Sequence, residues 1–123
     1  MTANLYLKNA KVVTEQEVFF GGIVVAGEKI AEVVKGSPEI AADQTIDVKG
    51  NLILPGIIDG HVHLNEPGRE AWEGYATGTQ AAAAGGITTL LDMPLNSTPP
   101  TINRAELKKK REVAAAKAYI DYA

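Results

Sequence analysis

Residues 54–101 read LPGIIDGHVHLNEPGREAWEGYATGTQAAAAGGITTLLDMPLNSTPPT. Within this stretch, IIDGHVHL has the length and apolar content of a strand, and the polar loop NEPGRE follows it. A helix is predicted from about Ala71 to Ala84, because the glycines at 85 and 86 end the helical pattern. ITTLLDM then predicts a second strand. A strand, a helix and a second strand in this order indicate a parallel sheet.

The same unit repeats toward the C-terminus. After the loop PLNSTPPT, a helix is predicted from about Arg104 to Lys117, and AYIDYA has the pattern of a third strand. The strands start near Ile57, Ile87 and Ala118, at the interval of about 30 residues typical of strand–helix–strand repeats. We therefore predict an α/β fold that begins a (β/α)8 TIM barrel. Such a barrel takes about 250 residues, so we expect a chain truncated after about two βα units of a longer parent protein.

The sequence before residue 54 has a different pattern. Short β segments are separated by turns that contain glycine, and apolar and polar residues alternate in the first and last segments. The segments are LYLKNAKVV, VFFGGIVVAG, KIAEVV and QTIDVKGNLIL. We predict a small β-sheet module at residues 1–53 and the incomplete barrel at residues 54–123.

Composition excludes several classes of protein. The 123 residues are 46% hydrophobic and 22% charged, which is typical of one globular core. The net charge of -3 gives no basic surface for nucleic acid, and no apolar run approaches the roughly 20 residues of a membrane-spanning helix. The N-terminus alternates apolar and polar residues, unlike a signal peptide, so we expect a cytoplasmic protein. The chain has no cysteine, and any metal ion must therefore be bound through nitrogen and oxygen.

Two histidines are the candidate metal ligands. His61 and His63 are two residues apart on a predicted strand, so both side chains project from one face with their Cα atoms about 6.5 Å apart. Both imidazoles could converge on one ion at the end of the strand where barrel enzymes place their chemistry. Asp59 precedes them on the same face and could stabilise the ion or orient a ligand. The alternatives are two ordinary histidines and an aspartate that caps a turn.

The motifs HVHLNEPG, WEGY and MPLN resemble those of the cyclic amidohydrolases of the amidohydrolase superfamily, and most of all the allantoinases. The resemblance implies an N-terminal β-sandwich, completed by C-terminal segments and fused to a TIM barrel. It also implies two divalent ions, usually zinc, bridged by a carbamylated lysine and by a hydroxide that attacks the ring amide. His61 and His63 would bind the more buried ion. Because the other ligands and the catalytic aspartate come from later strands, we expect no catalytic residue here and no activity of this piece alone.

Substrate preference is inferred from one position. Dihydroorotases have an arginine two residues after the second histidine, where it binds the substrate carboxylate, whereas this chain has Asn65. An amide suits a neutral cyclic ureide, so Asn65 and Asn96 are the predicted substrate-binding residues; Asn96 is equally well explained as a turn residue. The predicted reaction is hydrolysis of allantoin to allantoate in purine catabolism, and the resemblance implies a homotetramer. Alternatives are a dihydropyrimidinase or hydantoinase, a dihydroorotase-type enzyme, and a non-catalytic scaffold.

Other polar and aromatic residues are assigned structural roles. Trp72, Tyr75 and Thr79 have helical spacing and are predicted to pack one helix face. Glu70 is interpreted as an acid near a helix start. The charged run from Lys108 to Arg111 is predicted to be the solvated face of the second helix.

Overall fold

The computed structural model describes residues 3–123, which contain both strands and helices and confirm the α/β class. One compact unit ends at Pro55, and a second begins at Gly56. The first unit contains β1 (Ala3–Val13), β2 (Val18–Ala26), β3 (Lys29–Lys35), β4 (Ala42–Asp47) and β5 (Leu52–Ile53). The second contains β6 (Ile57–Val62), α1 (Tyr75–Ala84), β7 (Ile87–Asp92), α2 (Arg104–Lys117) and β8 (Asp121–Tyr122).

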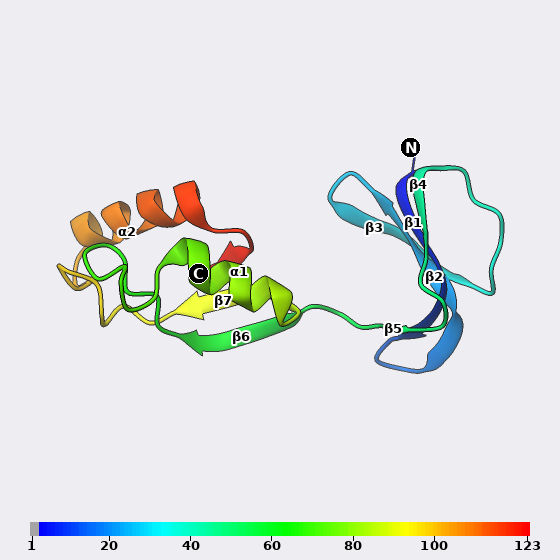
Figure 1. Ribbon diagram of the computed structural model, residues 1–123, viewed down its shortest axis with the longest axis horizontal. Helices are drawn as coiled ribbons and strands as arrows, with labels where there is room; N and C mark the ends of the chain where they lie inside the picture. The colour runs from blue at the N-terminus through cyan, green and yellow to red at the C-terminus, as the bar shows by residue number, and fades with distance from the viewer. Residues whose placement is uncertain (1–2) are drawn as a thin grey trace. The chain divides into compact units, whose positions relative to one another are not determined.

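The first unit is a mixed five-stranded sheet (Figure 1). The order is β3-β2-β1-β4, with β5 also paired to β1; β1 is antiparallel to β2 and parallel to β4 and β5. The last predicted segment is divided into β4 and β5, because Lys49 and Gly50 adopt positive φ angles of 56° and 77° and turn the chain. Tyr6, Val24 and Val34 form one buried cluster of the unit.

The second unit confirms the predicted strand–helix repeat. Its strands form a parallel sheet in the order β6-β7-β8, and α1 and α2 connect them on one side of the sheet (Figure 1). A buried cluster of Leu64, Tyr75, Leu90 and Ala114 joins the sheet to both helices. The carboxyl ends of β6 and β7 therefore lie at the same edge, where the loops that follow them meet.

The helix α2 has the predicted bounds, but α1 begins at Tyr75 instead of near Ala71. The backbone before Gly74 makes loop hydrogen bonds instead of helical ones, because the carbonyl of Glu73 accepts the Asn65 N–H at 2.8 Å. Trp72 consequently lies outside the helix and is 67% exposed, so its predicted packing role is wrong. Tyr75 and Thr79 are buried as expected.

Glu70 also lies before α1 and accepts a hydrogen bond from the Gly68 N–H at 3.3 Å. Hydrogen bonds from its own backbone N–H and then from that of Gly68 lower the pKa of Glu70. Because no acidic residue lies in the first turn of α1, the interpretation of Glu70 as an acid at the helix start is wrong. Among residues 3–123, neither helix is long and apolar enough to cross a membrane.

Candidate metal and active site

His61 and His63 bring their rings together at the carboxyl end of β6. His61 belongs to the strand, whereas His63 follows its last residue. Their Nε2 atoms are 3.2 Å apart, and the ring planes are inclined at 67°. Two ligands of a tetrahedral zinc ion at bond lengths of 2.0–2.1 Å would lie about 3.3–3.4 Å apart. The pair therefore fits two corners of one metal site, although the same spacing also permits a hydrogen bond between two neutral imidazoles.

The pair supplies only part of a coordination shell. Within residues 3–123, no cluster of three or more histidine, cysteine or acidic side chains is arranged to hold an ion. Asp59 is half-buried, and its Oδ1 accepts the backbone N–H of His61 at 3.1 Å. This contact orients the backbone of the first histidine. The further ligands of a catalytic zinc ion would have to come from elsewhere.

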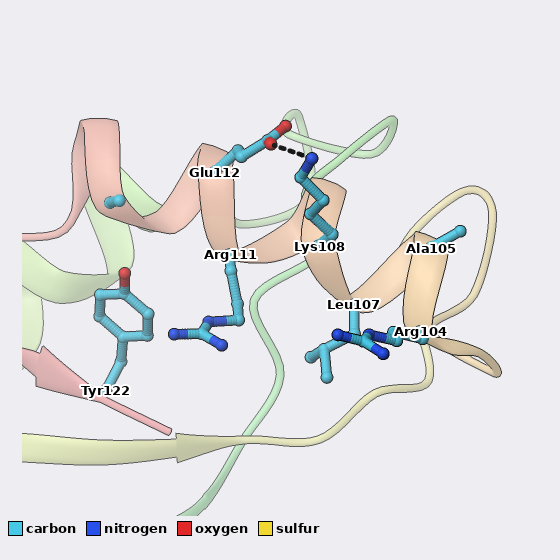
Figure 2. A pocket seen from close by; sticks show the side chains of 8 residues that line it. Arg104, Ala105, Leu107, Lys108, Arg111, Glu112 and Tyr122 are labelled. Carbon is cyan, nitrogen blue, oxygen red and sulfur yellow. Dashed lines mark ion pairs between the residues drawn. The ribbon is translucent and has the colours of Figure 1, made fainter.

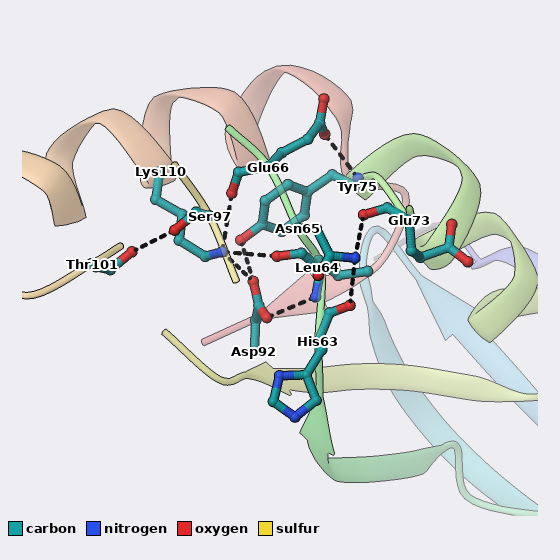
Figure 3. Close-up of polar contacts among 10 residues, drawn as sticks. All are labelled: His63, Leu64, Asn65, Glu66, Glu73, Tyr75, Asp92, Ser97, Thr101 and Lys110. Atoms are coloured by element: carbon teal, nitrogen blue, oxygen red, sulfur yellow. Dashed lines mark hydrogen bonds and ion pairs between the residues drawn. The ribbon is translucent and has the colours of Figure 1, made fainter. Parts of the chain in front are cut away.

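Behind the histidines lies a buried hydrogen-bond network centred on Asp92, the last residue of β7 (Figure 3). Asp92 Oδ1 accepts the Leu64 N–H at 2.9 Å, and Oδ2 accepts the Tyr75 hydroxyl and the Lys110 ammonium, each at 2.8 Å. Burial, and then the hydrogen bond with Asp92, raise the pKa of the Tyr75 hydroxyl. This carboxylate connects β7 to both helices and to the loop after His63.

The charged run from Lys108 to Arg111 was predicted to be solvent-exposed, and this prediction is wrong for Lys110. It is 5% exposed, while its neighbours Lys108 and Lys109 remain at the surface. Lys110 and Ala114 are one helical turn apart and form the buried side of α2, which faces the sheet. The Lys110 ammonium also donates to the carbonyl oxygens of Leu64 and Glu66, both at 3.0 Å.

Glu66 makes a second connection between the loop and the helices. Its side chain is buried, and Oε2 accepts the Tyr75 N–H, the first of α1, at 2.8 Å. Oε1 forms an ion pair with Lys117 in the last turn of α2. The hydrogen bond with Glu66 raises the pKa of Lys117. Glu66 thus connects the loop after His63 to the start of α1 and to the last turn of α2.

The two predicted substrate residues occupy the same edge of the sheet. Asn65 is 5% exposed, and its side-chain amide donates to the carbonyl of Glu73 at 3.2 Å. Its Oδ1 is buried without a hydrogen-bond partner in the described chain. Asn96 is half-buried in the loop after β7, next to Ser97, whose hydroxyl lies 3.3 Å from that of Thr101. The substrate roles of both asparagines stay predictions.

A separate groove of about 810 Å³ runs along α2 (Figure 2). Its lining side chains come from α2 and from Tyr122, and include Arg104, Lys108 and Arg111. The predicted metal and substrate residues are not among those that line it. The histidine pair therefore belongs to a different part of this unit.

Residues 52–120, more than half of the chain, match the amidohydrolase family. The chain belongs to this family. The matched range contains the histidine pair, Asp92 and Lys110.

Among curated relatives, allantoinases are similar to nearly the whole chain. The allantoinase of Streptomyces avermitilis is 48% identical over 118 residues, which are 95% of this chain and 26% of that protein. The allantoinases of Deinococcus radiodurans and Escherichia coli K12 are 47% and 45% identical over 99% and 100% of this chain. The resemblance to allantoinases is confirmed. The chain spans only about 27% of the length of these two relatives.

Solved structures of hydantoinases share the fold of the chain. L-Hydantoinase (dihydropyrimidinase) from Arthrobacter aurescens matches 99% of this chain and 27% of its own, with a TM-score of 0.90 and 27% identity. D-Hydantoinase from Bacillus sp. AR9 matches 98% of this chain and 26% of its own, with a TM-score of 0.80 and 30% identity. These matches support an amidohydrolase fold for the segment.

Asp92, Lys110, Glu66 and Tyr75 are the residues near the site that sequence reasoning missed. One signal was available for Asp92, which is the single acid that ends the apolar strand ITTLLD. For Tyr75, helical spacing predicted the burial but not the hydrogen bond to Asp92. Lys110 and Glu66 carried no signal, because a lysine in a charged run and a glutamate in a polar loop look solvent-exposed. Their burial follows from contacts between distant segments.

Proposed function

We propose that this chain is the N-terminal part of an allantoinase, which hydrolyses the cyclic amide bond of allantoin to give allantoate. The observation that supports a metal-dependent hydrolase is the 3.2 Å separation of the His61 and His63 Nε2 atoms, which suits adjacent ligands of one ion. The choice of substrate is supported by the 45–48% identity to allantoinases over at least 95% of the chain.

In this proposal, His61 and His63 hold one of two divalent ions, preferably zinc, and later parts of the protein supply the remaining ligands, including a carbamylated lysine. Bound metal would generate a hydroxide nucleophile at neutral pH and polarise the ring carbonyl. Asn65 and Asn96 lie in loops at the same sheet edge and would contact the neutral ureide ring through their amide groups. Asp59 keeps the backbone of His61 in place.

The same proposal extends to the architecture. The three parallel strands of residues 54–123 would be the first of eight in a TIM barrel, and the sheet of residues 1–53 would be one layer of a β-sandwich completed by C-terminal segments. The TM-score of 0.90 to the Arthrobacter aurescens enzyme supports this arrangement of each unit. A cytoplasmic homotetramer is the form that the family resemblance suggests.

The test uses the full-length protein. Metal content is measured by elemental analysis, and turnover of allantoin is measured before and after chelation and after zinc is restored. We expect about two equivalents of metal per chain, loss of turnover on chelation, and loss of metal in His61→Asn and His63→Asn. A folded protein without metal or turnover would contradict the proposal and favour a non-catalytic scaffold.

The second candidate is a hydantoinase or dihydropyrimidinase, favoured by the high structural similarity to such enzymes. Parallel assays with dihydrouracil, hydantoin and dihydroorotate distinguish the candidates. Faster opening of dihydrouracil than of allantoin would replace the proposed substrate while leaving the metal site intact. Dihydroorotate is expected to react poorly, because Asn65 offers no cation for its carboxylate.

A further inference from the structure

We propose that Lys110 and Asp92 are positioning residues, which clamp the peptide after His63 and so aim its imidazole at the metal ion. This inference rests on the proposed metal-binding role of the two histidines. It assigns a role in metal binding to a buried ion pair whose members are not themselves proposed as ligands.

The first support is the way the pair holds Leu64, the residue directly after His63. Asp92 accepts the Leu64 N–H at 2.9 Å, and Lys110 donates to the Leu64 carbonyl at 3.0 Å. Both backbone polar groups of Leu64 are thus taken by the two members of one ion pair. On the other side of the histidine, the Val62 carbonyl accepts the Met93 N–H at 2.8 Å. The backbone is therefore fixed on both sides of His63.

The second support is the His63 ring itself. A metal-binding histidine almost always donates its other ring N–H to a carboxylate, a carbonyl or water, and this bond sets the ring orientation. The Nδ1 atom of His63 is buried and has no hydrogen-bond partner among residues 3–123. The direction of its Nε2 atom therefore depends on the backbone that carries the ring, which is the part held by Asp92 and Lys110.

The third support is the burial of the Lys110–Asp92 ion pair and the hydrogen bonds that it makes (Figure 3). The side chains of Lys110 and Asp92 are 7% and 3% exposed, and their charged atoms are 2.8 Å apart. The three N–H donors of Lys110 match three acceptors: Asp92 and the carbonyl oxygens of Leu64 and Glu66. A buried ion pair is a poor way to gain stability compared with apolar packing. Its directional hydrogen bonds instead define one position for the chain after His63.

The experiment compares two double variants of the full-length protein. Lys110→Met with Asp92→Asn removes both buried charges together, so neither is left unpaired. Lys108→Met with Glu112→Gln is the matched control, because this pair lies on the same helix with side chains 79% and 64% exposed. Zinc affinity is measured by competition with a chromophoric chelator. Folding of the metal-free forms is followed by circular dichroism, and kcat and KM are measured at saturating zinc.

We expect the buried double variant to bind zinc about 10- to 100-fold more weakly than the control, with a lower kcat and a KM within about twofold. Zinc affinity within twofold of the control would overturn the inference, even if the melting temperature fell, because the pair would then serve stability alone. If the buried double variant does not fold, Lys110→Arg decides: it keeps the positive charge beside Asp92 but moves the donors away from the Leu64 and Glu66 carbonyl oxygens. Zinc affinity of Lys110→Arg within twofold of the control would also overturn the inference. Absence of zinc binding by the unsubstituted protein would instead refute the proposed function, and this inference with it.

Discussion

Glu66 caps the helix α1 from a position nine residues before the first residue of the helix. The N-cap residue of α1 is Gly74, which has no side chain to accept a helix N–H. Glu66 Oε2 accepts the Tyr75 N–H in its place, so a carboxylate lies at the positive end of the helix dipole. The close approach leaves little room at Gly74, where an added Cβ would lie 3.3 Å from the Glu66 carboxyl carbon.

Replacing Glu66 by glutamine is expected to destabilise the full-length protein by about 1–3 kcal/mol. Glutamine can still accept the Tyr75 N–H, but it loses the negative charge that faces Lys117 and the start of α1. The shift in the urea midpoint of unfolding of this unit measures the effect. Glu112→Gln, at an exposed position, is the control and should change the midpoint little. Equal midpoints for the two variants would contradict a stabilising role of the negative charge of Glu66.

Tyr75 is expected to make stability depend on alkaline pH. The pKa of its hydroxyl is raised in the folded state, so the folded protein retains this proton more strongly than the unfolded chain. Its contribution is complete below the ordinary tyrosine pKa of about 10 and is lost as the pH rises above that value.

Tyr75→Phe should therefore flatten the fall in melting temperature between about pH 9 and pH 11 relative to the unsubstituted protein. Tyr119→Phe is the control, because Tyr119 is 64% exposed. The prediction fails if Tyr75→Phe and Tyr119→Phe give the same pH profile.

The helix α2 has local signals at both ends, which explains why its bounds could be predicted. Asn103 caps it: the Asn103 side-chain oxygen accepts the N–H groups of Ala105 and Glu106 at 2.9 and 3.1 Å. Glu106 in the first turn and Lys117 in the last turn both suit the helix dipole. In α1, by contrast, the capping group is the side chain of Glu66, nine residues before the helix, and the start of α1 was predicted about one turn too early.

Asn103→Ala is expected to cost about 1 kcal/mol of stability and to speed hydrogen exchange at the amides of Ala105 and Glu106. Asn103→Asp keeps an acceptor and adds a favourable charge at the helix start, so it should preserve protection. Exchange measured by mass spectrometry or nuclear magnetic resonance compares the two variants. Similar exchange in both would show that the side-chain cap contributes little.

The second unit of the chain exposes apolar side chains that a complete protein would normally cover. On the strand β6, Ile57 and Ile58 are 57% and 67% exposed, and Leu91 of β7 is 38% exposed. Strand edges with unpaired backbone groups also favour association with other chains.

The 123-residue chain expressed alone is therefore expected to aggregate and to unfold without a cooperative transition, and it should not turn over allantoin. Size-exclusion chromatography with light scattering and a thermal melt measure these properties. The full-length protein under the same conditions is the control. A monomer with a sharp, reversible melt would contradict this expectation.

Local patterns in the sequence were enough to predict the strand–helix repeat, the bounds of α2, and the convergence of His61 and His63. Each of these features depends on residues that are close in sequence: alternation along a strand, a cap next to its helix, and two side chains on the same side of one segment. The TIM barrel, the β-sandwich and the substrate roles of the asparagines depend on the rest of the protein and stay proposals.

Only the tertiary structure decided that Lys110 and Glu66 are buried and that α1 begins at Tyr75. Lys110 bonds to Leu64 across 46 positions, and Lys117 pairs with Glu66 across 51. A local sequence pattern cannot predict contacts between residues so far apart. Without knowledge of its partners, a lysine or glutamate is predicted to be solvent-exposed. These charges are buried only because the parallel sheet and its two helices bring the partners together, and a buried charge without such partners would cost too much free energy to persist.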